Sequence, residues 1–339
     1  MSSSIGLRRA LVIGITGGIG GEVASALLQH GWQVYAMHRN PGLLQLPARL
    51  QGQVHLIPGD AMNADDVAKA AAIAVGPRAA VDDGSTIIVH AVNPPKYNNW
   101  KGLVLPMLEN TIAAARATSA RIVLPATVYN FGTDAPAKID ESTPQNPHTR
   151  KGQIRLEMEA RLQAATNDGV RSLVVRAGDF FGPNAGNNWF AQGLLGGRKT
   201  VSRVFYPGPR DIGHSWAYLP DLAQTIAQLL EPQRTLRPFD VFHFKGHWLP
   251  SGVAMAREIC GVLGLPERRI SAFPWWAVTL AAPFVEVCRE MREMRYLWRA
   301  PMELDNSKLC AALGPEPHTP LREAVQQTIA AGLHARASS

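Results

Sequence analysis

A glycine-rich turn close to the start of the chain constrains its fold more than any other feature. Gly14, Gly17 and Gly20 stand three residues apart, and they close an apolar run of mostly branched residues at 10–15. Glycine permits a sharp turn and lets a pyrophosphate approach the backbone, while the helix that follows offers free N–H groups and a positive dipole end. Between a strand and a helix, such a motif predicts a dinucleotide-binding unit.

The residues after this turn alternate between short apolar runs and stretches of helical period. The expected strands are 10–15, 33–37, 54–57, 86–90, 121–124 and 171–176, and the expected helices are 18–30, 64–74, 103–117 and 152–165. Strands that alternate with helices form parallel βαβ units whose sheet is covered on both faces. The fold class that we predict is therefore α/β, with a Rossmann-type doubly wound parallel sheet.

The regular alternation fades after Pro183. Residues 184–215 are rich in glycine, asparagine, proline and aromatic residues, which is typical either of loops over a ligand site or of irregular surface. The helices expected beyond them are 219–231, 251–264, 273–298 and 320–332. We predict an NADP-binding Rossmann domain at residues 1–183. A smaller, mostly helical C-terminal substrate lobe, interleaved with the last sheet strands, is expected at residues 184–339.

The end of the second expected strand indicates which dinucleotide binds. NAD-specific sites of this kind place an acidic residue there, where it bonds the ribose hydroxyls. No Asp or Glu occurs between Glu22 and Asp60, and the strand ends instead in His38 and Arg39. Because a guanidinium can pair with a 2′-phosphate, we predict NADP(H) as the cofactor. Asp60, followed by Ala61, has two open roles: a contact to the adenine amine, or the cap of the next helix.

Several segments, taken in order, resemble motifs of the short-chain dehydrogenase/reductase superfamily in its extended, epimerase/dehydratase-like form. The resembling segments are 16–20, 59–60, 90–92, 126–129, 176–183, 216–221 and 305–319. The resemblance covers nearly the whole chain and implies a nicotinamide dinucleotide cofactor. Beyond the residues already named, the cofactor-binding residues that it implies are Thr16, Gly18, Ile19, Ala91, Val92, Ala177, Gly178 and Asp179.

The catalytic residues of that superfamily do not carry over to this chain. Pro125 stands at the position of its Ser or Thr, three residues before the Val of the segment that resembles VYG. His148 stands where its Tyr would be, and Gly152 where its Lys would be. The resemblance therefore implies an atypical member that lacks the Tyr-x-x-x-Lys pair.

Other residues offer replacements for the missing pair. Lys151 begins a Lys-x-x-x-Arg segment that resembles the isoflavone-reductase-like branch, which uses one lysine at this place. Lys151 would hold the nicotinamide ribose and exchange a proton with the substrate, or it is a solvated lysine at a helix start. Thr127, Tyr129 and His148 are the further catalytic candidates, although a tyrosine in this context is more often packed as structure.

The expected function is that of an NADP(H)-dependent oxidoreductase acting on a carbonyl or activated double bond of a small organic molecule. Aromatic and polar residues could form the substrate pocket or the core of the lobe. These substrate candidates are Asn188, Trp189, Phe190, His214 and Trp216. Two alternatives remain open: a non-catalytic NADP(H) sensor that binds a partner, and a sugar-nucleotide epimerase or dehydratase.

Composition excludes several classes of function. The net charge is +7, but no Lys/Arg run is interleaved with aromatic residues, so we expect no nucleic-acid partner. Cys260, Cys288 and Cys310 lie far apart, which predicts neither disulfide nor metal site and favours a cytoplasmic protein. The apolar run 272–285 is shorter than the roughly 20 residues of a membrane-spanning helix, so no membrane insertion is expected. Tryptophans and arginines over 275–299 predict an amphipathic helix with a solvated face or a subunit contact, which leaves a homodimer open.

Overall fold

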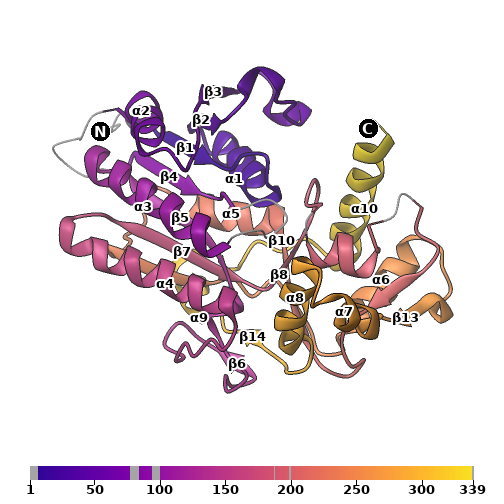
Figure 1. Ribbon diagram of the computed structural model, residues 1–339. Helices are drawn as coiled ribbons and strands as arrows, with labels where there is room; N and C mark the ends of the chain where they lie inside the picture. Colours follow the sequence, from indigo (N-terminus) through magenta and orange to yellow (C-terminus); the bar gives the residue numbers. More distant parts are fainter. Residues whose placement is uncertain (1–6, 77–83, 94–99, 187, 198–199, 338–339) are drawn as a thin grey trace.

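A seven-stranded parallel sheet with helices on both faces forms the body of the molecule (Figure 1). The computed structural model describes residues 7–76, 84–93, 100–186, 188–197 and 200–337. The strands of this sheet are β1 (Arg9–Ile13), β2 (Gln33–His38), β3 (Val54–Pro58), β4 (Thr86–His90), β5 (Arg121–Thr127), β7 (Ser172–Ala177) and β11 (Phe239–His243). Their order is β11-β7-β5-β4-β1-β2-β3, and every neighbouring pair is parallel. The predicted α/β doubly wound fold is confirmed.

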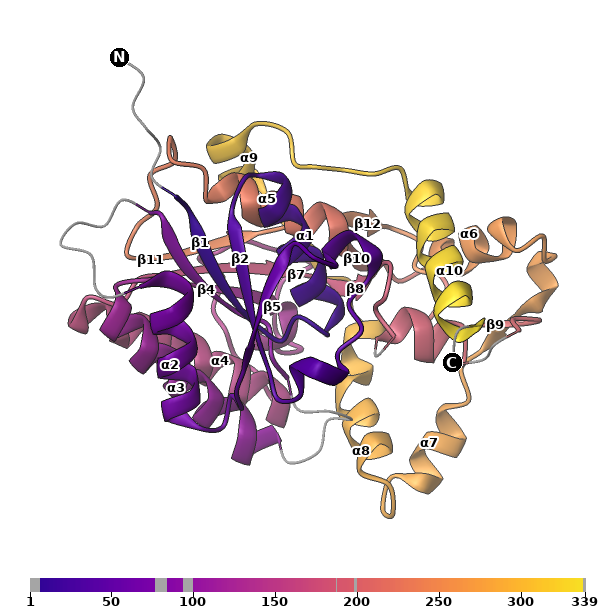
Figure 2. The same ribbon diagram turned by 90° about the horizontal axis from the view of Figure 1, so that it is seen from above.

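Alternating side chains of each strand feed two separate cores, as the period of two along a strand requires. Val12 belongs to the core under one helical layer, while Leu11 and Ile13 belong to the core under the other. The first layer holds α1 (Gly18–Gln29), α5 (Leu219–Leu229) and α9 (Ser307–Leu313); the second holds α2 (Ala64–Val75), α3 (Trp100–Thr118) and α4 (Arg150–Ala164). Figure 2 shows the two layers on opposite sides of the sheet.

A smaller lobe packs beside the carboxyl ends of the strands. It contains β8 (Asp179–Phe181), β9 (Val204–Tyr206), β10 (His214–Tyr218), β12 (His247–Leu249), β13 (Ile270–Ala272), α6 (Ala254–Val262), α7 (Trp275–Ala281), α8 (Glu286–Glu293) and α10 (Leu321–Ala337). The remaining strands, β6 (Lys138–Ile139) and β14 (Glu303–Leu304), pair with each other. Residues beyond 183 also return to the large sheet as β11, so the division at residue 183 stays a prediction.

Two predictions for this lobe are wrong. The single helix expected over 273–298 is broken into α7, α8 and a 3-10 turn at Met294–Trp298, because Pro283 lacks an N–H and disfavours helical backbone before it. Residues 204–206, expected in a loop, form β9, which pairs with β13. Within the described residues, no helix combines the length and apolar character needed to cross a bilayer.

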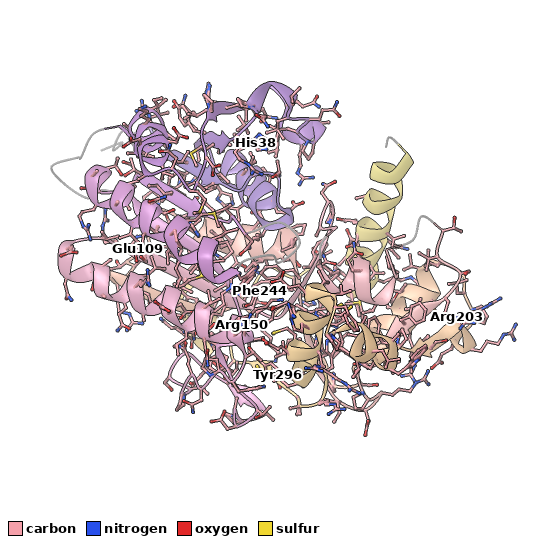
Figure 3. All side chains as sticks on the ribbon, viewed as in Figure 1. His38, Glu109, Arg150, Arg203, Phe244 and Tyr296 are labelled. Carbon is pink, nitrogen blue, oxygen red and sulfur yellow. The ribbon has the colours of Figure 1, made fainter. Side chains whose placement is uncertain are left out.

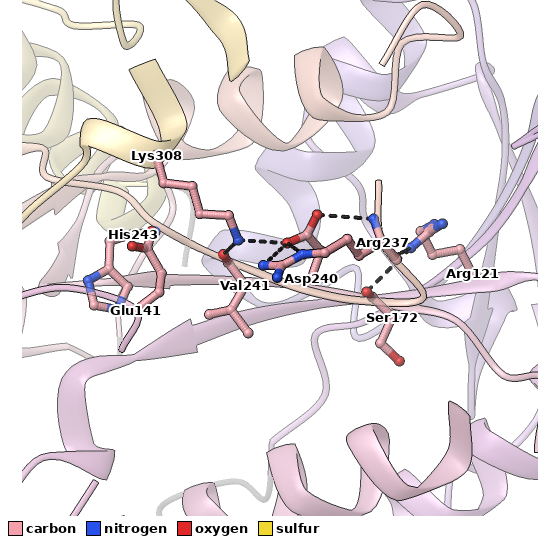
Figure 4. A network of polar contacts seen from close by, with 8 residues as sticks. All are labelled: Arg121, Glu141, Ser172, Arg237, Asp240, Val241, His243 and Lys308. Carbon is pink, nitrogen blue, oxygen red and sulfur yellow. Dashed lines mark hydrogen bonds and ion pairs between the residues drawn. The ribbon is translucent and has the colours of Figure 1, made fainter. Parts of the chain in front are cut away.

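The segment after β14 is tied back to the large sheet by buried polar contacts. Lys308 on α9 donates from Nζ to Asp240 Oδ1 at 2.6 Å and to the Val241 carbonyl at 2.5 Å (Figure 4). Arg237 bonds the same carboxylate, so Asp240 has a lowered pKa although burial alone would raise it. Asp221 accepts from the N–H and the hydroxyl of Thr319, both at 2.7 Å. These contacts hold the segment between β14 and α10 against β11 and α5.

Candidate functional site

The glycine turn between β1 and α1 leaves no room for side chains. A Cβ at Gly14, whose φ is +101°, would lie 2.6 Å from the Ala91 carbonyl carbon, and one at Gly20 would collide with the Gly14 carbonyl. Gly17 caps α1 without any side-chain hydrogen bond, and no acidic residue lies in the first helical turn. The N–H groups of this helix start are therefore available to an anion, as a pyrophosphate site requires.

A cavity of about 530 Å³ opens at this turn and continues along the carboxyl ends of the strands. It lies where the strand order reverses, between β1 and β4, which is the position of ligand sites in open α/β sheets. All the predicted cofactor residues line it except Gly20, Ala177 and Lys151. Gly20 and Ala177 are buried and do not reach the surface of the cavity.

One end of the cavity is formed by His38, Arg39 and Asp60, beside Met37 and Met62. Asp60 does not cap α2: Asn63 does so, accepting from Asp65 N and Asp66 N. Asp60 Oδ1 instead accepts from Met62 N at 2.9 Å. Arg39 is exposed at this end, and no carboxylate among the described residues pairs with it. Figure 3 shows His38 beside β2, on the part of the molecule away from Tyr296.

The other end of the cavity gathers hydroxyl and carboxylate groups. Thr127 at the end of β5 is buried, and its Oγ1 has no hydrogen-bond partner among the described residues. Tyr129 follows in the turn Val128–Asn130 and lines the same wall. Asp179 begins β8 opposite them, so three groups able to bond a substrate oxygen face one space.

Asp179 is held by a histidine from the neighbouring strand. His214 Nε2 lies 2.8 Å from Asp179 Oδ2, and both side chains are buried. The imidazole stacks on Trp298 with ring centroids 3.9 Å apart and an interplanar angle of 7°. A Cβ at Gly178 would collide with Ser215, so glycine at 178 allows β8 and β10 to come this close. Asp179 and His214 were both candidates from the sequence, but the contact between them was not predicted.

Lys151 does not line the cavity, although its Nζ lies 5.5 Å from the centroid of the Trp100 ring, which does. Its Nζ lies 3.1 Å from Glu290 Oε2 on α8, and both side chains are buried. Burial lowers the pKa of Lys151, although Glu290 and Glu293 oppose that shift. His148 is also outside the cavity lining. It is exposed, and its ring centroid lies 4.5 Å from that of Tyr296. The structure thus brings only Thr127 and Tyr129 of the four catalytic candidates to the cavity.

A close approach explains why the expected lysine position holds glycine. A Cβ at Gly152 would collide with the Tyr129 carbonyl and lie 2.6 Å from Pro147 Cβ. Helix α4 therefore lies against the turn at Val128–Asn130, and any side chain at 152 would push it away.

Arg155, one turn further along α4, lines the cavity in place of Lys151. Its Nη2 donates to Asn93 Oδ1 at 3.1 Å, and its guanidinium lies 5.1 Å from the Trp100 ring centroid. Arg155, Asn93 and Trp100 are site residues that sequence reasoning missed. Helical spacing from Lys151 was the one signal that could have indicated the arginine.

Of the substrate candidates, Asn188 and Trp189 line the cavity. Asn188 caps the helical turn Trp189–Leu194, accepting from Ala191 N at 2.8 Å. Phe190 and Trp216 lie instead in the core of the smaller lobe, so the alternative role as lobe core describes them. Both rings pack against Phe181 of β8, with ring centroids 5.6 Å from it for Phe190 and 6.1 Å for Trp216.

Comparisons with known proteins agree with this architecture. The sequence profile of the RmlD substrate binding domain matches residues 8–284. A dTDP-glucose 4,6-dehydratase from Streptomyces venezuelae, solved with NAD and TYD bound, superposes with a TM-score of 0.72 at 16% identity, over 97% of this chain and 98% of its own. A UDP-glucuronic acid 4-epimerase from Bacillus cereus, solved with UDP-glucuronic acid and NAD, gives 0.72 at 14% identity, over 96% and 99%.

An epimerase from Methanothermobacter thermautotrophicus gives a TM-score of 0.75 at 15% identity, over 98% of this chain and 94% of that one. A comparison with curated protein sequences gave no match. At such identities the solved structures show a shared fold, while the profile match spans most of the chain. The chain therefore belongs to the RmlD substrate binding domain family, within the extended short-chain dehydrogenase/reductase superfamily.

Proposed function

We propose that this protein is an NADP(H)-dependent oxidoreductase that acts on a carbonyl or hydroxyl group of a small polar molecule. One observation carries the proposal: a single cavity joins the glycine turn to Thr127, Tyr129 and Asp179. The glycine turn supports a pyrophosphate because α1 begins there with no side-chain cap and no acidic residue in its first turn. A bound nicotinamide supplies hydride transfer, and the protein has to orient the substrate and move its proton.

Proton transfer is assigned to the described groups of the cavity. Thr127 Oγ1, which has no partner among the described residues, donates a hydrogen bond to the substrate oxygen. The carboxylate of Asp179 accepts the hydroxyl proton when the substrate is oxidised and returns it when the substrate is reduced. His214 orients that carboxylate through its bond to Oδ2, and Tyr129 bonds the substrate from the opposite wall. Arg155 adds a positive charge that suits an anionic substrate.

NADP(H) is the proposed form of the cofactor because Arg39 is exposed at the cavity end that holds Asp60. Two of the solved relatives contain NAD instead. Residues 23–59 of this chain contain no acid that could bond the ribose hydroxyls.

An epimerase or dehydratase acting on a sugar nucleotide is the second candidate. The solved relatives favour it, since they include a dTDP-glucose 4,6-dehydratase and a UDP-glucuronic acid 4-epimerase, the latter with UDP-glucuronic acid bound. A sensor without chemistry is less favoured, because Asp179 places an ionisable group in the cavity.

The state of the cofactor in the purified protein tests these functions. An oxidoreductase exchanges its cofactor in each turnover, so we expect added NADP⁺ to bind reversibly and NADPH to be consumed with carbonyl substrates. An epimerase recycles its cofactor, and NAD(H) released only on denaturation would support that candidate. A protein that binds NADP⁺ reversibly, leaves NADPH unconsumed with carbonyl substrates and converts no sugar nucleotide would contradict both.

A further inference from the structure

Helices α7 and α8 form an arm on the smaller lobe, defined here as residues 275–293. The two helices contact each other and are joined by residues 282–285. Figure 2 shows this arm reaching away from the large sheet, with its connecting loop at the edge of the molecule. The arm is therefore presented to the surroundings.

Large apolar side chains are concentrated on the outer side of this arm. Trp276 is 72% exposed, Leu280 69% and Phe284 89%, and Val285 and Val287 are exposed beside them. Nine large hydrophobic residues are exposed in the described part of the chain, and five of them lie within residues 276–287. Scattered exposed apolar residues are ordinary, whereas a contiguous cluster marks an interaction surface.

The apolar character of the arm exceeds what the lobe needs for its core. No charged residue occurs between Arg269 and Glu286. Trp275 and Val278 supply the buried side of α7, where the Trp275 indole donates to the Pro207 carbonyl at 2.6 Å. Trp276 and Leu280, four residues apart on the opposite side, pack against nothing in the lobe that would bury them.

The charges beside this apolar surface are of both signs, with a small excess of arginine. Residues 284–299 hold four arginines and three glutamates, and Arg289 and Arg292, three residues apart on α8, are both exposed. Glu290 is buried against Lys151, Glu293 accepts from Arg150 N at 3.1 Å, and Glu286 at the start of the helix is half-buried. With Glu290 neutralised by Lys151, this stretch keeps an excess of positive charge, on a chain whose net charge is +7.

We propose that the α7–α8 arm docks this protein on an anionic lipid bilayer. Aromatic and aliphatic side chains at the loop enter the interface, while Arg289 and Arg292 meet the lipid headgroups. A second copy of the chain is a poorer occupant, because a two-fold contact through this arm would bring the arginines of the two copies together. The arm lies on the membrane surface and does not cross it, and this docking does not depend on the chemistry of the cavity.

Co-sedimentation of the full chain with vesicles tests the proposal. We expect binding to phosphatidylglycerol-containing vesicles, weaker binding to pure phosphatidylcholine, and loss of binding as salt is added. The variant Leu280→Ser/Phe284→Ser should weaken binding at least roughly tenfold, because burial of each side chain is lost. Arg289→Gln/Arg292→Gln should weaken binding to anionic vesicles by roughly fivefold per charge and leave the weak binding to neutral vesicles unchanged.

Matched variants outside the arm separate docking from general surface effects. Leu43→Ser/Ile73→Ser removes two exposed apolar residues of the large domain, and Arg203→Gln/Arg322→Gln removes two exposed arginines. Both should bind vesicles as the parent does, and circular dichroism checks that every variant is folded. The proposal is overturned if anionic vesicles do not bind the parent, or if the arm variants bind as well as it does. A dimer in solution that the arm variant dissociates, without vesicle binding, would assign the surface to a second copy instead.

Discussion

His214 donates to Asp179 from Nε2 across 2.8 Å, and this buried pair places a fixed carboxylate in the wall of the cofactor cavity. The two residues come from adjacent parallel strands, β8 and β10, and they lie 35 positions apart in the sequence. A chain that lacks the usual tyrosine and lysine thus retains a group able to exchange protons at this place.

Replacing the carboxylate tests its role. Asp179→Asn keeps the shape of the side chain but cannot accept a proton, so we expect kcat to fall by about 10²- to 10⁴-fold. The Kd for NADP⁺, measured by calorimetry, should change little. His214→Gln should lower kcat less and alter its pH profile, because the histidine acts through the carboxylate. Unchanged kcat in Asp179→Asn would return proton transfer to Tyr129.

Thr127→Val should separate activity from stability. Because Thr127 Oγ1 has no partner in the described structure, its removal leaves no buried group newly unsatisfied, and the free energy of unfolding should fall by less than about 1 kcal/mol. Turnover should fall by roughly 10²-fold, since a donor to the substrate oxygen is lost. Thr225→Val is the control: its hydroxyl bonds the Asp221 carbonyl inside α5, away from the cavity, and kcat should be unaffected. Equal kcat in Thr127→Val and the parent would remove Thr127 from the mechanism.

Arg39→Met should change the cofactor preference. Loss of a charge-assisted contact to the 2′-phosphate should raise the Kd for NADP⁺ by roughly ten- to a hundredfold and leave that for NAD⁺ nearly unchanged. Arg116→Met, at a surface ion pair with Asp168, is the matched control. Equal loss for both dinucleotides would argue against recognition of the 2′-phosphate.

Lys151→Met should act on stability more than on turnover. It leaves Glu290 buried without its partner, which costs about 3–5 kcal/mol in the free energy of unfolding. Adding Glu290→Gln should recover part of that loss, and Lys138→Met, at an exposed pair with Asp305, should leave the free energy of unfolding nearly unchanged. Denaturant unfolding measures all three. A folded Lys151→Met protein of normal stability without turnover would instead support the catalytic role that the sequence indicates for Lys151.

Three buried histidines should make the protein sensitive to acid. Burial, with Arg155 nearby, lowers the pKa of His90 to about 3. Burial, with Arg176 nearby, lowers the pKa of His243 to about 3. Burial beside His318 lowers the pKa of His247 to about 4. The ordinary pKa of a histidine is 6.5, so below pH 6.5 the unfolded chain binds protons that the folded protein does not. The free energy of unfolding therefore decreases as the pH is lowered from about 6.5 to about 4. The slope is about 1.4 kcal/mol per pH unit for each histidine.

Urea unfolding across this pH range measures the slope. His247→Gln should reduce the slope by about one third because one of three groups is removed. A stability that stays flat down to pH 5 would contradict the buried neutral state of these histidines.

The elements with a local cause could be predicted from the sequence alone. The glycine turn after β1, the alternation of apolar strands and amphipathic helices, and the missing acid after β2 each lie within a short stretch, so the parallel sheet and many residues of the cavity lining could be predicted. The helix break near Pro283 also has a local cause, the ring and the missing N–H of proline, but a single helix over 273–298 was expected there.

Which side chains meet depends on the packing of distant elements. Lys151 and Arg155 lie one helical turn apart on α4, yet α8 brings Glu290 against the lysine and leaves the arginine at the cavity. Asp179 and His214 are joined by strand pairing over a long interval of sequence, and nothing near either residue indicates its partner. Local propensity sets where helices and strands begin and end, whereas the packing of distant elements sets the partners of each polar group, and the chemistry of this site depends on those partners.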